Sequence, residues 1–312
     1  MNRAFIFPGQ GSQYVGMGKD FYDSENIAEE IFEKVNNALG YNLLDIIFNG
    51  PEADLTITIN TQPAITAVSI AIFKVLLARL NLPVDKLCAV TAGHSLGEYS
   101  ALCAAGSISI EDAAKLLKIR AHSMQNASPQ GEGAMAACIG ISSKDLQNLI
   151  TNTVTEGVCS IANDNVEGQI VISGHACNID KIITSMHKMN LRAIKLNVSA
   201  PFHSPLIQKA ENPMREALDN TDFAKPQVPI IPNVSAIEES DVETIKTNLV
   251  KQISGTVRWR ETMDRLAASG ITELVEIGPG KVLSGLAKKT THNFKIFNIA
   301  TMRDLDSYLD QL

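Results

Sequence analysis

Hydrophobic and polar positions follow two alternating periods along most of this 312-residue chain. Short apolar runs typical of buried strands occur at 4–7, 87–90, 134–139, 158–162, 169–173, 191–198, 229–233 and 274–277. Segments whose apolar residues have helical spacing separate these runs, at 27–39, 62–80, 98–105, 110–123, 144–151, 179–189, 242–252, 259–268 and 283–289. Because strands and helices alternate, we predict an α/β layered fold with a parallel sheet.

The order of the predicted elements changes between residues 128 and 197. Strand, helix, strand, strand, helix and strand follow one another there, which is the ferredoxin-like arrangement. Residues 163–165 and Gly168 are predicted to form the turn between the second and third of these strands. We therefore expect a small ferredoxin-like subdomain at 128–197, inserted into a large domain made of 1–127 and 198–312. A cleft between the two is the expected place for a ligand.

Composition and charge exclude several classes of protein. Hydrophobic residues make up 45% of the chain, which is ample for a sizeable core. The net charge of −7 argues against a nucleic-acid partner. The sequence contains no uninterrupted run of about 18 apolar residues, so we predict no membrane span.

A reducing cytoplasm is the expected location. The five cysteines are scattered through apolar segments and no pair has C-x-x-C spacing, so neither a disulfide framework nor a zinc site is indicated. The apolar run at 4–7 is too short for the core of a signal peptide. We further expect the protein to be a monomer.

The segment at residues 93–97 carries the strongest chemical signal. It reads G-x-S-x-G between an apolar run and a helical pattern, where a serine lies on a sharp turn with its hydroxyl exposed. The flanking glycines remove side chains that would clash in so tight a bend. The motif also occurs by chance as an ordinary glycine-rich turn, so the strand–turn–helix context is what favours Ser95 as a nucleophile.

A nucleophilic serine needs a base, and the chain has six histidines. His203 lies in a loop with two prolines and follows Ser95 in chain order, as the base does in other enzymes with this turn. The alternative for His203 is a surface histidine in a proline-containing turn. His94 is adjacent to Ser95, but neighbouring side chains on a tight turn point in different directions, so we expect His94 to form part of the pocket wall.

No acidic residue stands close to His203 in the sequence. A backbone carbonyl can orient an imidazole in place of the usual carboxylate, with less electrostatic gain. Such a pair suits a thioester better than an amide, because a thiolate is a good leaving group that needs little assistance from an acid. The residues therefore favour acyl transfer from a thioester.

Two donors are expected to stabilise the acyl oxyanion. The backbone N–H of Leu96, directly after the serine, is the first, and the loop at 8–13 can supply the second because Gln10 lies between two glycines. This loop lacks the third glycine and the lysine of the common nucleotide-binding motifs, so no bound nucleotide cofactor is expected.

Arg120 lies late in the predicted helix at 110–123. An arginine in this place commonly interacts with the C-terminal end of its helix or faces solvent. If it points inward, its planar group of donors is suited to a carboxylate.

Several motifs, in the same order along the chain, resemble those of malonyl-CoA:acyl carrier protein transacylases. They lie at 7–13, 93–99, 168–174 and 276–283. The match extends over essentially the whole chain. The resemblance implies a hydrolase-like core with a nucleophile elbow and an inserted ferredoxin-like subdomain.

The resemblance also implies a role for each matching residue. Ser95 resembles the nucleophile, His203 the base, Gln10 and the Leu96 amide the oxyanion donors, Arg120 the residue that binds the malonyl carboxylate, and Gln252 the residue whose backbone carbonyl orients the base. Phe202 resembles the pattern of malonyl-selective domains and would narrow the space near the α-carbon of the substrate.

The implied reaction is ping-pong transfer of a malonyl group from malonyl-CoA, through Ser95, to the phosphopantetheine thiol of acyl carrier protein. No metal and no bound cofactor are needed for it. Two alternatives remain open: a thioesterase, which would use water as the acceptor, and a non-enzymatic module that docks a carrier protein. The arginine and the absence of an obvious triad acid favour transfer, and the intact serine motif, His203 and Gln10 argue against the docking module.

Overall fold

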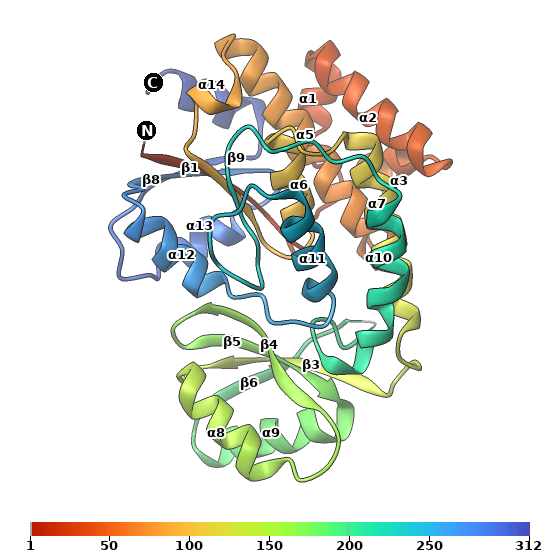
Figure 1. Cartoon of the computed structure of the whole chain (residues 1–312), viewed down its shortest axis with the longest axis vertical. Helices are drawn as coiled ribbons and strands as arrows, with labels where there is room; N and C mark the ends of the chain where they lie inside the picture. The colour runs from red at the N-terminus through yellow and green to blue at the C-terminus, as the bar shows by residue number, and fades with distance from the viewer. Residues whose placement is uncertain (1, 199) are drawn as a thin grey trace.

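The computed structural model describes residues 2–198 and 200–312. The first of its two sheets consists of five strands (Figure 1). In spatial order these are β7 (Ile230–Ile231), β2 (Val90–Gly93), β1 (Arg3–Phe7), β8 (Glu273–Ile277) and β9 (Lys295–Ile299). Every neighbouring pair is parallel. Parallel strands are joined by crossover segments that cover both faces of a sheet, and the last four residues of β1 are accordingly buried.

Alternate residues of β1 face two different hydrophobic clusters. The main helices around the sheet are α2 (Asn26–Leu39), α5 (Thr58–Leu80), α6 (Gly97–Ala104), α7 (Ile110–Asn126), α11 (Val242–Gln252), α12 (Trp259–Ala268) and α13 (Val282–Ala287). Phe5 and Phe7 lie in the larger cluster, where Phe73 of α5 meets both rings edge-on. Ala4 and Ile6 lie in the second cluster with residues of α12 and α13. The two-residue period of the strand thus places helices on both faces.

Helix α5 crosses the centre of the larger cluster. By length and composition it would suffice to cross a membrane, yet 72% of its apolar window is buried inside the protein, as expected for a core helix. Polar residues such as Lys74 interrupt its apolar sequence, which is why a search for an uninterrupted apolar run does not find it.

A second sheet lies below the first in Figure 1 and is antiparallel. The chain passes in order through β3 (Gly133–Ile139), α8 (Ser143–Thr153), β4 (Cys159–Val166), β5 (Gln169–His175), α9 (Ala176–Lys188) and β6 (Arg192–Lys195). The spatial order of the strands is β4-β5-β3-β6. One face packs on α8 and α9 in a cluster of its own, while Met135 and Val171 join the larger cluster of the parallel sheet. The second sheet is therefore held between its own helices and the rest of the molecule.

The outer edge of β4 is bound to the segment that leads into α12. The N–H of Val257 donates to the carbonyl of Ala162, and the N–H of Asp164 donates to the carbonyl of Val257. Arg260 then contacts the Asp164 carboxylate at 2.8 Å. We call these contacts between β4 and residues 256–260 the seam.

The structure corrects two of the predicted strands. The strand before Ser95 begins at Val90 and not at residue 87, because Val84–Lys86 form a short 3-10 helix and Leu87 and Cys88 are buried outside the strand. Residues 163–165 belong to β4 and do not form a turn. They have partners on both sides, β5 and Val257, and two register shifts in the β4–β5 pairing accommodate these polar residues.

Some helices have the bounds that the sequence pattern predicts, whereas other elements of the structure were not predicted. Helices α11 and α12 have the predicted bounds. Besides β9, the pattern missed α1 (Lys19–Ser24), α3 (Leu43–Asn49), α4 (Glu52–Thr56), α10 (Glu211–Asp219) and α14 (Met302–Leu309). These helices are short, so a period of 3.6 residues repeats too few times in them to be recognised.

Candidate active site

Ser95 lies on a sharp turn between β2 and α6, with its backbone in the left-handed region at φ 54°. The turn is possible only with glycines around it, since a Cβ on Gly93 would lie 1.9 Å from the carbonyl oxygen of Gly97. The N–H of Ser95 donates to Oδ1 of Asn233 at 2.7 Å, which holds the strained residue in place. The serine side chain is thereby fixed at the carboxyl end of the parallel sheet.

His203 is the hydrogen-bond partner of the serine. Its Nε2 lies 2.8 Å from Ser95 Oγ, and its Nδ1 lies 2.8 Å from the backbone carbonyl oxygen of Gln252. A carbonyl only accepts, so Nδ1 carries the proton in the neutral ring and Nε2 is free to accept the serine proton. Burial, with a further contribution from the charge of Arg120, lowers the pKa of His203 to about 3. The imidazole is therefore neutral at pH 7.

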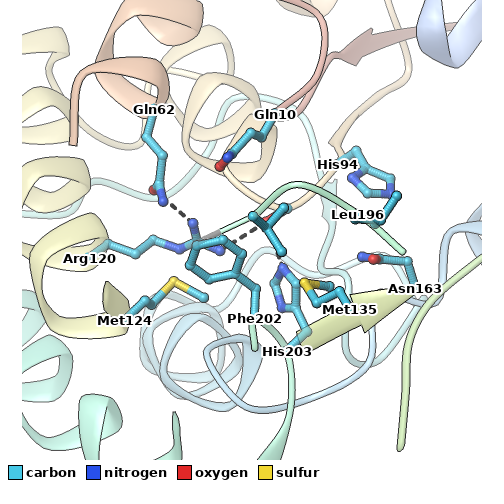
Figure 2. A pocket seen from close by; sticks show the side chains of 12 residues that line it. Gln10, Gln62, His94, Arg120, Met124, Met135, Asn163, Leu196, Phe202 and His203 are labelled. Carbon is cyan, nitrogen blue, oxygen red and sulfur yellow. Dashed lines mark hydrogen bonds between the residues drawn. The ribbon is translucent and has the colours of Figure 1, made fainter. Parts of the chain in front are cut away.

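Arg120 lies on α7, is 1% exposed, and points toward Gln62 in the pocket (Figure 2). Its guanidinium donates to Gln62 Oε1 at 2.7 Å, to Gln252 Oε1 at 2.8 Å and to Ser95 Oγ at 3.0 Å. All three partners are uncharged. A buried cation whose hydrogen-bond partners are all neutral is suited to a ligand that brings a negative charge.

These groups meet in a cavity of about 130 Å³. Polar side chains from the serine turn and its surroundings line one part of it: Gln10, Gln62, His94, Ser95, Arg120, Asn163 and His203. Apolar side chains line the other part: Met124, Met135, Leu196, Val198 and Phe202. Met135 and Asn163 come from the antiparallel sheet, so both sheets contribute to the site (Figure 2).

The loop that carries Gln10 lies directly against the serine turn. A Cβ on Gly9 would come within 2.6 Å of the carbonyl oxygen of His94, so only glycine permits this approach. Gln10 therefore reaches the cavity although it is distant from Ser95 in sequence. The side chain of Leu96 is buried, and its backbone follows the serine on the turn.

His94 points away from the hydroxyl group of Ser95. Its Nε2 lies 2.8 Å from Asn165 Oδ1 on β4, and its ring packs edge-on against Trp259. Burial lowers the pKa of His94. The ring that faces the serine hydroxyl is that of His203.

Comparison with known proteins identifies the family. A family model described as acyl transferase domain matches residues 4–308. The malonyl CoA-acyl carrier protein transacylase of Bacillus subtilis (strain 168) is 41% identical over 312 residues, covering 99% of this chain and 96% of the relative. The protein of the same name from Staphylococcus aureus (strain MRSA252) is 38% identical over 307 residues, covering 98% and 97%. The chain belongs to the malonyl CoA-acyl carrier protein transacylase family.

Solved structures agree with this assignment. The acyl-carrier-protein-S-malonyltransferase from Bartonella henselae superposes with a TM-score of 0.97 at 48% identity, covering 100% of this chain and 99% of that one. A malonyl-transacylase in complex with a type II PKS acyl-carrier protein superposes with a TM-score of 0.95 at 34% identity, and the match covers 100% of each chain. The family resemblance inferred from the motifs is thus confirmed.

The structure brings together around Ser95 all the residues singled out in the sequence of this transacylase. Gln10, His94, Arg120 and His203 line one cavity with Ser95, and Gln252 lies behind it. The side chain of Gln252 has a further position that the motif did not suggest. Its Oε1 accepts from Arg120, while its Nε2 donates to the carbonyl of Ser95 at 3.1 Å.

Besides the apolar lining and Asn163, the sequence analysis gave no role to three polar residues of the site: Gln62, Glu98 and Asn233. Asn233 directly follows an apolar run, and a polar residue after a parallel strand is a usual place for a ligand or support group, so a signal was present. Glu98 is the single charged residue of α6, all of whose residues are buried, so its carboxyl group is in the interior. For Gln62, inside α5, no signal distinguishes it from its neighbours.

Among the residues that the structure describes, no group of three or more His, Cys, Asp or Glu side chains is placed to hold a metal ion.

Proposed function

We propose that this transacylase moves the malonyl group of malonyl-CoA to the phosphopantetheine thiol of an acyl carrier protein, supplying extender units for fatty acid biosynthesis. The observation that carries the proposal is the Ser95–His203 pair next to a buried arginine whose partners are all neutral. A serine and a histidine suffice for acyl transfer. The arginine adds a reason why the acyl group should end in a carboxylate.

In the first half-reaction His203 Nε2 takes the proton of Ser95 Oγ while the oxygen attacks the thioester carbonyl. The backbone N–H of Leu96 and Gln10 are proposed to donate to the oxyanion that forms. When the tetrahedral intermediate collapses, the C–S bond breaks and His203 returns the proton to the CoA thiolate. The malonyl group is then an ester of Ser95.

In the second half-reaction the roles are reversed. His203 takes the proton of the carrier thiol, the thiolate attacks the serine ester, the C–Oγ bond breaks as the tetrahedral intermediate collapses, and His203 returns the proton to Ser95 Oγ. The carbonyl of Gln252 holds the ring in the tautomer that both steps require.

Arg120 is proposed to bind the malonyl carboxylate. One of its hydrogen bonds goes to Ser95 Oγ, the oxygen that must become free to attack. A substrate carboxylate can replace this contact, so substrate binding would release the nucleophile and pair the guanidinium at the same time.

Several finer features belong to the same proposal. We infer that the turn at Ser95 is a nucleophile elbow in a hydrolase-like core made of 1–127 and 198–312, and that 128–197 is a ferredoxin-like subdomain. The strand order β4-β5-β3-β6 supports this subdomain assignment. We further propose a cytoplasmic monomer that uses the CoA thioester and the phosphopantetheinyl carrier as substrates and binds no cofactor.

An intact-mass measurement tests the proposed function. Incubation with malonyl-CoA should add one malonyl group to the wild-type protein and none to Ser95→Ala, and added holo-acyl carrier protein should discharge the adduct. Rapid loss of the malonyl group to water without a carrier would instead identify a thioesterase. If no adduct forms under any condition, the chain is not an acyltransferase of this kind.

A further inference from the structure

The mechanism above makes no use of Glu98, an acidic residue at the centre of the site. Glu98 is the second residue of α6, three positions after the serine, and is 1% exposed. A buried carboxylate is costly unless it is paired and hydrogen-bonded. A buried glutamate at this position therefore indicates a role that an apolar residue could not perform.

Only one oxygen of the Glu98 carboxylate has partners among the described residues. Oε2 accepts from the backbone N–H of Asn233 at 2.9 Å and from Gln252 Nε2 at 2.7 Å. Oε1 is buried without a hydrogen-bond partner. The carboxylate thus interacts with two residues that themselves contact Ser95.

Glu98 provides the shortest of the three hydrogen bonds that orient the Gln252 side-chain amide, at 2.7 Å against 3.1 Å to the Ser95 carbonyl and 3.3 Å to Asn233 Oδ1. An amide has an oxygen that accepts and an NH₂ group that donates, and rotation by half a turn exchanges them. Arg120 has only donors, so it is held by Gln252 only when the amide oxygen faces it. The NH₂ group must then point the other way, where Glu98 Oε2 accepts it.

The other hydrogen bond of Glu98, from the N–H of Asn233, supports the backbone of Ser95. The N–H of Asn233 donates to Glu98, and its Oδ1 accepts the N–H of Ser95. Gln252 Nε2 also donates to the Ser95 carbonyl. Loss of the carboxylate could therefore disturb Ser95 as well as Arg120, and a test must separate the two effects.

We propose that Glu98 is a positioning residue for malonyl recognition, whose carboxylate fixes the Gln252 amide so that its oxygen holds the Arg120 guanidinium in the orientation that receives the substrate carboxylate. This inference rests on the proposed function. It assigns Glu98 no contact with the substrate. Glu98 acts through Gln252, and the hydrogen-bond acceptor, not the charge, is the required feature.

Two substitutions at Glu98 distinguish the effect of its hydrogen-bond-accepting oxygen from the effect of its negative charge. Glu98→Leu removes the shortest hydrogen bond of the Gln252 NH₂ group, so that the Ser95 carbonyl at 3.1 Å and Asn233 Oδ1 at 3.3 Å are left to hold the amide. Glu98→Gln removes the charge but keeps an oxygen that can accept from both Asn233 and Gln252, with its NH₂ group where Oε1 has no partner. The measured quantity is kcat/KM for malonyl-CoA and for acetyl-CoA, with holo-acyl carrier protein as acceptor.

We expect Glu98→Leu to lower the malonyl-to-acetyl ratio of kcat/KM by between about ten- and a hundredfold, the scale of loss when a reacting group is misplaced by about 1 Å. Glu98→Gln should keep the ratio within about threefold of the wild type. Equal losses of malonyl and acetyl transfer in Glu98→Leu would assign Glu98 to the serine turn and overturn the proposal. The proposal would also be overturned if the malonyl-to-acetyl ratio of Glu98→Gln were as low as that of Glu98→Leu, because the negative charge of Glu98 would then be required.

A double-mutant cycle tests whether Glu98 acts through Gln252. Gln252→Leu keeps the backbone carbonyl that orients His203 but loses the side-chain amide. If the proposal holds, Glu98→Leu lowers the malonyl-to-acetyl ratio no further in the Gln252→Leu background. Independent, multiplying losses would overturn it. Failure of the proposed function would look different, since the wild-type protein itself would then form no malonyl adduct.

Discussion

At the residue scale, His203 is assigned as the base because its ring is hydrogen-bonded to Ser95 Oγ. We expect His203→Ala to slow acylation of Ser95 by about 10²–10⁴-fold, the usual contribution of one positioned base. The pre-steady-state rate of malonyl adduct formation measures this directly. His94→Ala is the matched control, because His94 faces Asn165 and not the serine hydroxyl. A near-normal rate in His203→Ala together with an inactive His94→Ala would reverse the assignment.

The buried carboxyl of Glu98 also predicts a pH dependence of stability. Burial raises its pKa from 4.5 to about 7, against the opposing effects of its hydrogen bonds to Asn233 and Gln252 and of the Arg120 charge. Because the pKa is higher in the folded state, its contribution to stability is full below about pH 4.5 and is lost as the pH rises through about 7. The loss is on the order of 3 kcal/mol.

Glu98→Gln does not titrate, so its free energy of unfolding should fall less than that of the wild type between pH 4.5 and pH 8. Urea unfolding of both proteins at several pH values in this interval measures the difference. Identical pH dependence in the two proteins would mean that Glu98 has an ordinary pKa in the folded state. Within this account Glu98 lowers stability at neutral pH while it supports the site.

The sequence predicted single residues of the site best where a local motif surrounds them. Ser95 stands between two glycines whose close contacts demand glycine, and Gln10 stands between Gly9, which has such a contact, and Gly11, which has a φ of 101°. Asn233 and Gln62 contact the site from distant segments through ordinary side-chain hydrogen bonds. Such contacts arise from tertiary packing, so the pattern around Gln62 carries no sign of them, and the sign at Asn233 is only its place at the end of an apolar run.

At the scale of elements, the turn between β2 and α6 depends on the absence of a side chain at Gly93. In Gly93→Ala the new Cβ would meet backbone atoms of Gly97 that cannot move independently of the turn. We expect destabilisation of at least about 1–3 kcal/mol, the usual cost of overpacking. Thermal unfolding measures it.

Gly285→Ala in α13 is the matched control. A Cβ there meets nothing within 4 Å, so the alanine should be neutral or stabilise the helix by roughly 0.5–1 kcal/mol. A Gly93→Ala protein as stable as Gly285→Ala would show that the turn can open without cost, contrary to the geometry described here.

The elements that the sequence predicted best are amphipathic helices of ten or more residues, such as α11 and α12. The pattern failed at β4, where Asn163, Asp164 and Asn165 have the composition of a turn. In the strand the N–H of Asp164 donates to Val257, the Asp164 carboxylate pairs with Arg260, and the Asn165 side chain contacts His94, and all three partners lie outside the second sheet. Tertiary partners overrode the local preference, and the side-chain partners Arg260 and His94 lie 96 and 71 residues away in the sequence.

At the scale of the whole molecule, the seam joins the two sheets on which the site is built. The Asp164 carboxylate is mostly buried, so Arg260→Ala would leave a buried charge unpaired. We expect a loss of about 1–3 kcal/mol of unfolding free energy, because the arginine itself is partly exposed and solvent weakens the pair. Hydrogen exchange of the β4 amides should accelerate and KM for malonyl-CoA should rise, since Asn163 of β4 lines the cavity.

Arg265→Ala is the control for the seam, since Arg265 pairs with Glu238 near the surface, where solvent and salt screen the pair. Unchanged β4 exchange in Arg260→Ala would mean that the backbone contacts of Val257 hold the seam without the ion pair.

The central claim is that Ser95 transfers a malonyl group selected by Arg120, and kcat/KM for malonyl-CoA and acetyl-CoA in wild type and Arg120→Ala tests it most directly. Malonyl and acetyl thioesters differ by one carboxylate, and an acetyl group would leave the arginine buried and unpaired. We predict that Arg120→Ala loses about 2–5 kcal/mol of transition-state stabilisation for malonyl transfer while acetyl transfer holds steady or rises, and that Arg120→Lys restores only part of the malonyl activity. Equal losses for both substrates would contradict the account, because the malonyl carboxylate would then be recognised elsewhere.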